Sequence, residues 1–450
     1  MAYHDEAVSS LVSSFRGGDG PVRLAKRTSN LFRTRRPAAG SGLDVAAFDR
    51  VLHVDPVMLT AEVEGMTTYE NLVAATLRHG LMPLVVPQLR TITVGGAVTG
   101  IGIESSSFRS GLVHESVREM EILTGDGDLV VAAPDNDNAD LYYGFPNSYG
   151  SLGYALRLQI DLEPVQPYVE LRHLRFTDHA ALFAAMGEIC DAGAWFGAPV
   201  DFVDGVVFDR DDLVLTLGRF VDGAPYRSDY TGMQVYYRSL QRRTLDYLDT
   251  SAYLWRWDTD WFWCSKTFRV QNPWIRSLVP PPLLRSSNYW KLLAVVQRSG
   301  LDRRLDSLAG RGEREMIVQD VEVPVERSGE FLDFFHREIG ILPVWICPTR
   351  QRDPGVTWSL YSMDPDVLYV NFGFWSSQML GPGEAQGTYN RKIEAKVAEL
   401  GGRKSLYSTA YYRPDEFWRT YGGDAYHDLK DRYDAKSRLL DLYQKTVERK

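Results

Sequence analysis

Two glycine-rich segments, residues 93–107 and 147–154, hold the residue types whose spacing points most directly to chemistry. In both segments glycines recur between β-prone and hydroxyl-bearing residues. Because glycine lacks a side chain, such a backbone can lie close to a flat ring and a pyrophosphate. Small polar side chains and backbone N–H groups can then bind the phosphates. The pattern predicts a flavin-binding core, and the competing interpretation is that these glycines only form tight turns between strands.

The spacing Gly100-x-Gly102-x-x-Ser105 is also that of a dinucleotide-binding fingerprint. That fingerprint needs a preceding strand, a following helix and an acidic residue about 20 positions later. Residues 105–111 are instead polar and end in glycine, and residues 117–123 alternate like a strand. This context excludes a Rossmann-type site.

A basic loop provides a second candidate for phosphate binding. Lys26 begins it, and Thr28, Ser29, Asn30 and Leu31 follow. Its hydroxyls, amide and positive charge suit a pyrophosphate. A loop of this composition is equally typical of a plain solvated surface.

Composition narrows the class of protein. The 450 residues include 50 Lys and Arg against 59 Asp and Glu, a net charge of -9 that argues against a nucleic-acid partner. Cys190, Cys264 and Cys347 lack the spacing of a disulfide framework or a zinc site, so we expect no metal. With no signal-like N-terminus and no apolar run of about 20 residues, we expect a cytoplasmic protein, soluble or peripheral to the inner face of the membrane.

Hydrophobic periodicity predicts the elements that position these residues. Before Pro167 it predicts one helix, at residues 69–79, and strands at residues 51–54, 61–63, 84–86, 117–123, 129–132 and 155–162. After Pro167 it predicts a strand pair within residues 205–218, strands at 169–176, 317–323, 344–347 and 368–372, and helices at 178–190, 388–400 and 433–447. A chain this long exceeds a single core. We therefore predict an α+β protein with a flavin domain at 1–167, a cap or substrate domain at 168–400, and a segment at 401–450 that returns to the flavin site.

Residues 24–167 resemble the PCMH-type FAD-binding domain of the vanillyl-alcohol-oxidase superfamily, and in particular that of the delta-24 sterol reductases. Those proteins carry Thr-Val-Gly-Gly followed by Gly-x-Gly-Ile-Glu-Ser-Ser-Ser, which residues 93–96 and 100–107 match. Residues 146–153 and parts of residues 401–418 are similar too.

A closer likeness is to the actinobacterial flavoproteins that reduce a 10-methylene fatty acyl chain to the 10-methyl form found in tuberculostearic acid. They share the features at residues 87–107 and 258–264. This resemblance implies reduction of a methylene-branched acyl chain, with sterol side-chain reduction as the alternative. An FAD-dependent oxidase, or a non-catalytic flavoprotein that supports a partner methyltransferase, stays open as well.

The resemblance implies a two-domain PCMH-type fold in which FAD lies between the flavin domain and an α+β cap. We expect non-covalent FAD, because the loop at residues 28–31 has no histidine to tether it, and NADPH as electron donor. The implied cofactor-binding residues are Lys26, Thr28, Ser29, Asn30, Leu31, Gln88, Thr93, Gly95, Gly96, Gly100, Gly102, Ile103, Glu104, Ser105, Ser106, His114, Gly150 and Gly153.

Reducing an isolated double bond needs a proton as well as a hydride, because no carbonyl stabilises the developing charge. The candidate catalytic residues are Tyr407, Tyr411 and Lys404, although each tyrosine is equally typical of a core residue with a bonded hydroxyl. The aromatic residues at 255–263 suit either an acyl tunnel or core packing. Residues 274–292 suit either a membrane surface that presents a lipid acyl substrate or an ordinary protein surface.

Overall fold

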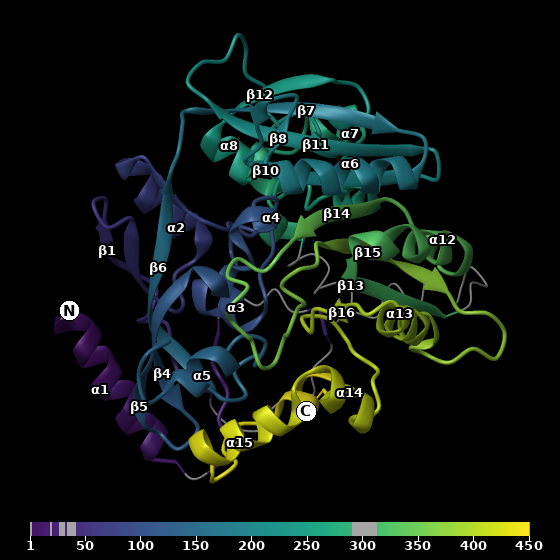
Figure 1. The fold of residues 1–450 in the computed structure, drawn as a ribbon. Coiled ribbons are helices and arrows are strands. Elements are labelled where there is room, and N and C mark those ends of the chain that lie inside the picture. The colour runs from purple at the N-terminus through teal and green to yellow at the C-terminus, as the bar shows by residue number, and fades with distance from the viewer. Residues whose placement is uncertain (1, 19, 27–31, 34–41, 290–312, 450) are drawn as a thin grey trace.

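The computed structural model describes residues 2–18, 20–26, 32–33, 42–289 and 313–449, and two large β sheets form its framework (Figure 1). The first sheet has the order β1-β2-β6-β4-β5, with β3 paired to β6, and its pairs are antiparallel. Its strands are β1 (Val51–Asp55), β2 (Thr60–Glu64), β3 (Leu81–Pro83), β4 (Val117–Thr124), β5 (Leu129–Ala132) and β6 (Gly153–Pro164).

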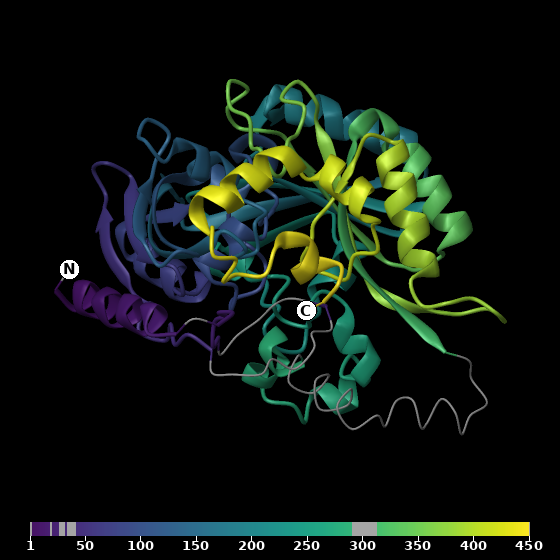
Figure 2. The same ribbon diagram turned by 90° about the horizontal axis from the view of Figure 1, so that it is seen from below.

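The second sheet has eight antiparallel strands in the order β12-β7-β11-β10-β14-β15-β13-β16. Its strands are β7 (Tyr168–Phe176), β10 (Phe202–Asp209), β11 (Asp212–Val221), β12 (Leu245–Asp249), β13 (Arg314–Pro324), β14 (Val344–Thr349), β15 (Tyr369–Met379) and β16 (Arg403–Lys404). One face packs on helices α6 (His179–Ala192), α12 (Ser328–Glu338) and α13 (Thr388–Glu399), and Figure 2 shows the last two side by side. The other face packs on the aromatic residues near Trp257.

Short elements complete the chain between these sheets. They are α3 (Val94–Thr99), α4 (Ser107–Ser110), η2 (Val113–Ser116), α5 (Ala139–Gly144), the β8 (Ala194–Trp195) and β9 (Ala198–Pro199) pair, α7 (Tyr236–Leu240), α8 (Thr250–Leu254), η3 (Cys264–Phe268), α9 (Pro273–Arg276), η4 (Pro281–Leu284) and η5 (Val325–Arg327). No helix in the described ranges is both long and apolar enough to cross a bilayer.

Both ends of the chain pack on the first sheet. Helix α1 (Ala2–Arg16) lies beside β5, where Arg16 Nη2 is 2.9 Å from Asp128 Oδ1 (Figure 1). After β16, helices α14 (Pro414–Thr420), α15 (Gly423–Tyr433) and α16 (Leu442–Thr446) cross back, and Arg432 on α15 bonds Asp140 on α5 at 2.8 Å. The C-terminal helices therefore contact the first half of the chain, while the segment's expected return to a flavin site stays a prediction.

Most of the predicted elements are confirmed. The helix predicted at 69–79 is α2 (Tyr69–Thr76) followed by η1 (Leu77–His79), with Thr68 accepting the Asn71 N–H as a cap. The strands match except that β3 occupies Leu81–Pro83 in place of 84–86. The strands on either side of Pro167 lie in different sheets, while the domain boundaries themselves stay a prediction.

The helix predicted at 433–447 is wrong. Helix α15 ends at Tyr433 and α16 begins only at Leu442. Between them the Asp434 carboxylate accepts the N–H groups of Arg438 and Leu439, and these bonds replace a helical turn. Helices α1 and α3 were not predicted. In α3, the Thr93 cap overrides the low helix propensity of two glycines.

A buried ion cluster joins the two sheets. Arg256 Nη2 lies 3.1 Å from Glu104 Oε1, in the loop after α3, and 2.8 Å from Asp204 Oδ2 on β10. Both Trp257 and Trp345 donate an indole N–H to the same Asp204 oxygen. All three charged side chains are almost inaccessible, so each carboxylate depends on the guanidinium to balance its buried charge.

We predict that Arg256→Leu lowers the free energy of unfolding by about 3–5 kcal/mol, because two carboxylates lose their buried cation. Chemical denaturation followed by circular dichroism measures this change. The matched control is Arg419→Leu, because Arg419 is exposed and meets only Asp415 at 3.5 Å, and it should stay within about 0.5 kcal/mol of the wild type. Equal effects of the two substitutions would show that the cluster does not hold the sheets together.

Candidate functional site

A cavity of about 380 Å³ opens where the first half of the chain, the eight-stranded sheet and the C-terminal segment meet. Residues from distant parts of the sequence line it. They are Arg23, Leu24, Lys26, Phe32, Arg33, Met66, Pro87, Gln88, Leu89, Thr91, Ile92, Thr93, Gly95, Gly96, Ala97, Thr99, Gly100, Ile101, Gly102, Ile103, Tyr149, Gly150, Gly153, Tyr154, Ala155, Trp261, Phe262, Asp320, Trp375, Ser405, Tyr407, Leu440 and Lys445.

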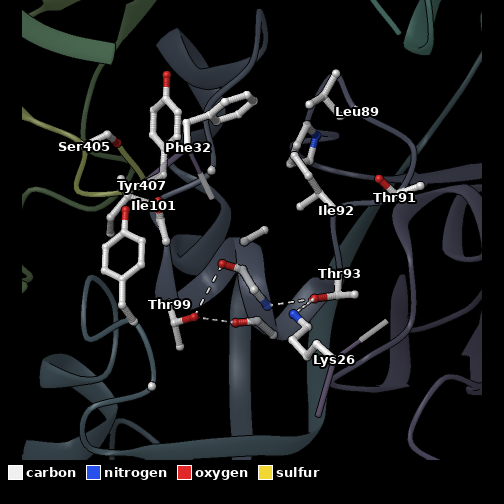
Figure 3. A pocket seen from close by; sticks show the side chains of 18 of the residues that line it. Lys26, Phe32, Leu89, Thr91, Ile92, Thr93, Thr99, Ile101, Ser405 and Tyr407 are labelled. Atoms are coloured by element: carbon white, nitrogen blue, oxygen red, sulfur yellow. Dashed lines mark hydrogen bonds between the residues drawn. The ribbon is translucent and has the colours of Figure 1, made fainter. Parts of the chain in front are cut away.

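Polar groups gather at one end of the cavity, around helix α3 (Figure 3). Lys26 Nζ donates to Thr93 Oγ1 over 3.1 Å, and Thr93 accepts the Gly96 N–H at 3.3 Å. A Cβ on Gly96 would lie 2.8 Å from Thr93 Oγ1 and 3.5 Å from Lys26 Nζ. The absent side chain keeps open a space beside an amine and a hydroxyl, which fits a phosphate-bearing cofactor.

Trp261, Phe262 and Trp375 form an aromatic wall of the cavity, with the Phe262 and Trp375 ring centroids 4.3 Å apart. Asp260, Trp261 and Phe262 all adopt left-handed backbone, with φ of 69°, 46° and 58°. Such a conformation costs about 1–2 kcal/mol per non-glycine residue. A buried two-point ion pair between Asp260 and Arg276, at 2.6 and 2.8 Å, fixes the start of this run. The aromatic wall is therefore held in place by a strained and clamped backbone.

Tyr407 and Asp320 lie close together at the cavity, where their electrostatic interaction shifts both pKa values. The Trp375 indole N–H donates to the Tyr407 oxygen over 3.1 Å. Burial raises the pKa of Asp320 to about 7, against the lowering effect of its bonds from Asn371 and Tyr407. Burial and the neighbouring Asp320 also raise the pKa of Tyr407 well above its usual range. Near neutral pH the pair therefore holds a protonated tyrosine beside a carboxyl that is about half protonated.

The backbone makes room for this pair. Asp320 on β13 is the register partner of Gly373 on β15. A Cβ on Gly373 would lie 2.5 Å from Asp320 Oδ1 and 2.7 Å from the Trp375 ring. Glycine at this position is what allows the carboxylate and the indole to share one face of the sheet.

Eleven of the predicted site residues line the cavity. They are Lys26, Gln88, Thr93, Gly95, Gly96, Gly100, Gly102, Ile103, Gly150 and Gly153 among the cofactor candidates, and Tyr407 among the catalytic ones. The predicted Thr28, Ser29, Asn30 and Leu31 lie outside the described residues.

Four predicted cofactor residues do not line the cavity, because their side chains are engaged elsewhere. Glu104 bonds Arg256, Ser105 Oγ lies 2.9 Å from Tyr253 Oη, and Ser106 donates to the Leu84 carbonyl. His114 packs edge-on against Trp358 with ring centroids 4.5 Å apart, and burial lowers its pKa to about 3. These four side chains therefore lie outside the cavity lining.

Two predicted catalytic residues also lie away from the cavity. Lys404 is fully buried, and its Nζ lies 2.7 Å from Glu394 Oε1. Strand β16 ends at Lys404 and a turn follows, and Ser405 and Tyr407 line the cavity whereas Lys404 does not. Tyr411 packs beside helix α13, where its N–H donates to Glu394 at 3.2 Å.

The sequence reasoning missed Asp320, Trp375 and the role of Phe262. Residues 317–323 were predicted as a strand, and acidic residues at 320 and 322 interrupt their apolar pattern. A carboxylate within a buried strand is rare without a partner or a function, and this was the available signal. No local pattern indicated Trp375, because it reaches the cavity only through strand pairing.

Comparison with known proteins supports a flavin-binding role for this cavity. A family profile described as "FAD binding domain" matches residues 2–133. The chain is similar to the Delta(24)-sterol reductase of Rattus norvegicus, at 28% identity over 88% of this chain and 75% of the relative. It is 25% identical to the Delta(24)-sterol reductase of Arabidopsis thaliana over 98% of this chain and 84% of the relative. It is 32% identical to Cytokinin dehydrogenase 7 of Oryza sativa subsp. japonica over 32% of this chain and 27% of the relative.

We call the part of the cavity formed by Lys26, Thr93 and Gly96 the glycine-bearing edge, and its open space and these similarities both indicate bound FAD. The protein has an α+β PCMH-type fold with an FAD-binding domain, and it is an FAD-dependent oxidoreductase.

We predict that Gly96→Val weakens FAD binding by at least tenfold, because the new side chain enters the space between Thr93 and Lys26. Flavin absorbance after gel filtration, and titration of the apoprotein with FAD, measure the loss. Gly187→Val is the matched control, since nothing lies within 4 Å of a Cβ there. Full flavin occupancy in Gly96→Val would show that α3 does not contact the cofactor.

Proposed function

We propose that this protein reduces an isolated carbon–carbon double bond in a lipid, and that its substrate is a 10-methylene fatty acyl chain, converted to the 10-methyl form with electrons from NADPH. The observation that carries the proposal is the pairing of an aromatic wall with one proton-holding site, Tyr407 and Asp320. Among the described residues that line the cavity, Asp320 is the only carboxylate. The choice of acyl chain and of NADPH rests on resemblance.

The chemistry of the alkene explains why such a pair is needed. A proton added to the methylene carbon leaves positive charge on the tertiary carbon, and no carbonyl is available to share it. Bound FAD, once reduced by NADPH, would supply the hydride that this carbon accepts. The protein must therefore hold a proton donor beside the double bond, exclude water and tolerate transient positive charge.

Each part of the cavity suits one of these tasks. The Tyr407 hydroxyl gives its proton to the substrate, and the neighbouring Asp320, when protonated, returns a proton to the tyrosine oxygen. The Trp375 N–H fixes the tyrosine oxygen and stabilises the charge that develops there. The rings of Trp261 and Phe262 exclude water, and their π faces attract a cationic carbon.

FAD would be held by residues of the glycine-bearing edge, with Lys26, Thr93 and Gly96 beside its phosphates. None of the described residues that line the cavity is a histidine or a cysteine, which supports non-covalent binding. Denaturation in acid should then release all of the flavin into the supernatant.

We predict that the purified protein, given NADPH without oxygen, adds two hydrogens to 10-methylene lipids. Mass spectrometry of lipid extracts after the reaction, together with bleaching of the flavin absorbance, tests this. A two-hydrogen gain on 24-unsaturated sterols alone would favour sterol reduction, the candidate that the similarity to Delta(24)-sterol reductases supports. Rapid reoxidation by air with peroxide release and no use of NADPH would indicate an oxidase. Bound flavin that NADPH never reduces would indicate a non-catalytic partner of a methyltransferase.

We predict that Tyr407→Phe and Asp320→Asn each lower the rate of the reduction step by about 10²–10⁴-fold, the usual contribution of a general acid. Because the pKa of Asp320 is about 7, its protonated fraction falls as pH rises through that value. The wild-type rate should therefore decline above pH 7, and Asp320→Asn should lose this limb. Rapid-mixing measurements of flavin reoxidation by substrate across pH 6–9 test both points.

The exposed Asp211 supplies a control, since Asp211→Asn should keep both the rate and the descending limb. Stability separates a chemical from a structural effect. Asp320 has a folded-state pKa raised above its unfolded value, so the free energy of unfolding falls as pH rises from about 4 to 7. Asp320→Asn should therefore be at least as stable as the wild type at pH 8. A destabilised variant with an unchanged limb would contradict the role of Asp320.

A further inference from the structure

An exposed apolar surface lies on the segment that follows the aromatic wall. Trp274 is 84% exposed and Leu278 is 83% exposed, and Met233, Leu283 and Ile275 are 55%, 53% and 38% exposed. We call these five residues the Trp274 face. Monomeric proteins rarely leave so many large apolar side chains together in water, and such groups mark an interaction site.

Buried bonds preorganise the Trp274 face. Arg276 lies beneath it and donates from Nε to the Gly232 carbonyl at 2.7 Å and from Nη2 to the Gln234 carbonyl at 3.3 Å. These bonds place Met233 beside helix α9, which carries Trp274 and Ile275. The exposure of this face is therefore a fixed feature of the fold, and the side chains do not need to rearrange to meet a partner.

The segment that carries most of the Trp274 face has charged side chains of one sign. Residues 261–289 contain no Asp or Glu and four basic residues, namely Lys266, Arg269, Arg276 and Arg285. Arg276 is neutralised internally by Asp260, and Arg285 lies 3.3 Å from Glu70. Lys266 and Arg269 are exposed. Apolar side chains led by tryptophan, flanked by lysine and arginine, suit the interface of a bilayer that contains anionic lipids.

We propose that the Trp274 face docks on the surface of an anionic lipid bilayer. The same segment that carries the face also supplies Trp261 and Phe262 to the cavity, and the teal-green chain that contains it protrudes from the body in Figure 2. A docked protein thus receives lipid acyl chains beside its aromatic wall. This use of the face rests on the proposed lipid substrate, whereas docking itself does not.

Vesicle flotation tests the docking without any substrate. The holoprotein is mixed with vesicles of phosphatidylcholine alone, or of phosphatidylcholine with phosphatidylglycerol, and its bound fraction is measured. We expect binding to the anionic vesicles that weakens with salt. Trp274→Ser combined with Leu278→Ser should lower the partition coefficient at least tenfold. Lys266→Gln and Arg269→Gln should each lower it about fivefold.

Phe196→Ser is the matched control, because Phe196 is 89% exposed on the β8 and β9 hairpin and outside the Trp274 face, and it should leave the partition unchanged. Retained flavin absorbance shows that each variant is folded. Binding that is equal in the wild type and the Trp274 and Leu278 double variant would overturn the proposal. So would a wild type that ignores vesicles but forms dimers that the double variant loses. Docking without reduction of any lipid would keep this inference and remove the proposed function.

Discussion

The burial of Arg256 between two carboxylates is the constraint on which the rest of the structure depends. A guanidinium cannot stay in the interior without partners, so the chain must bring Glu104, Asp204 and Arg256 to one point. Glu104 ends the glycine-rich segment, Asp204 lies on β10, and Arg256 begins the aromatic segment. One charge cluster therefore fixes the flavin domain, the eight-stranded sheet and the aromatic wall relative to one another.

A second buried ion pair, between Asp260 and Arg276, lies in the same aromatic segment as Arg256. Asp260 and Arg276 hold a left-handed turn that few sequences without glycine would adopt, and the turn aims Trp261 and Phe262 at the cavity. Glycine at positions 261 and 262 would relieve the backbone strain, but it would remove the two aromatic rings from the cavity. Strain, aromatic surface and buried charge thus serve one requirement, which is to present an apolar wall in the same cavity as Thr93 and Gly96.

The local sequence pattern was sufficient to predict most strands and the glycine-bearing edge. Alternating hydrophobic residues and glycines can both be identified from the sequence alone. Gly96 and Thr93 were found this way. The local sequence pattern failed for the helix predicted at 433–447. There the Asp434 carboxylate accepts hydrogen bonds from two backbone N–H groups, and helix α15 ends just before it. It also failed for Asp320 and Trp375, since strand register between distant residues decides what faces the cavity.

The cavity is assembled from residues as far apart as Lys26 and Lys445. During synthesis at about 5–20 residues per second, the glycine-rich segment emerges long before β13, Tyr407 or α16. A nascent chain therefore has the glycine-rich lining of the cavity before it has Trp375 or Tyr407. The cofactor can be retained only late in synthesis, and once held it favours the folded chain over the unfolded one. The cellular supply of flavin should thus determine how much of the newly synthesised protein reaches the folded state.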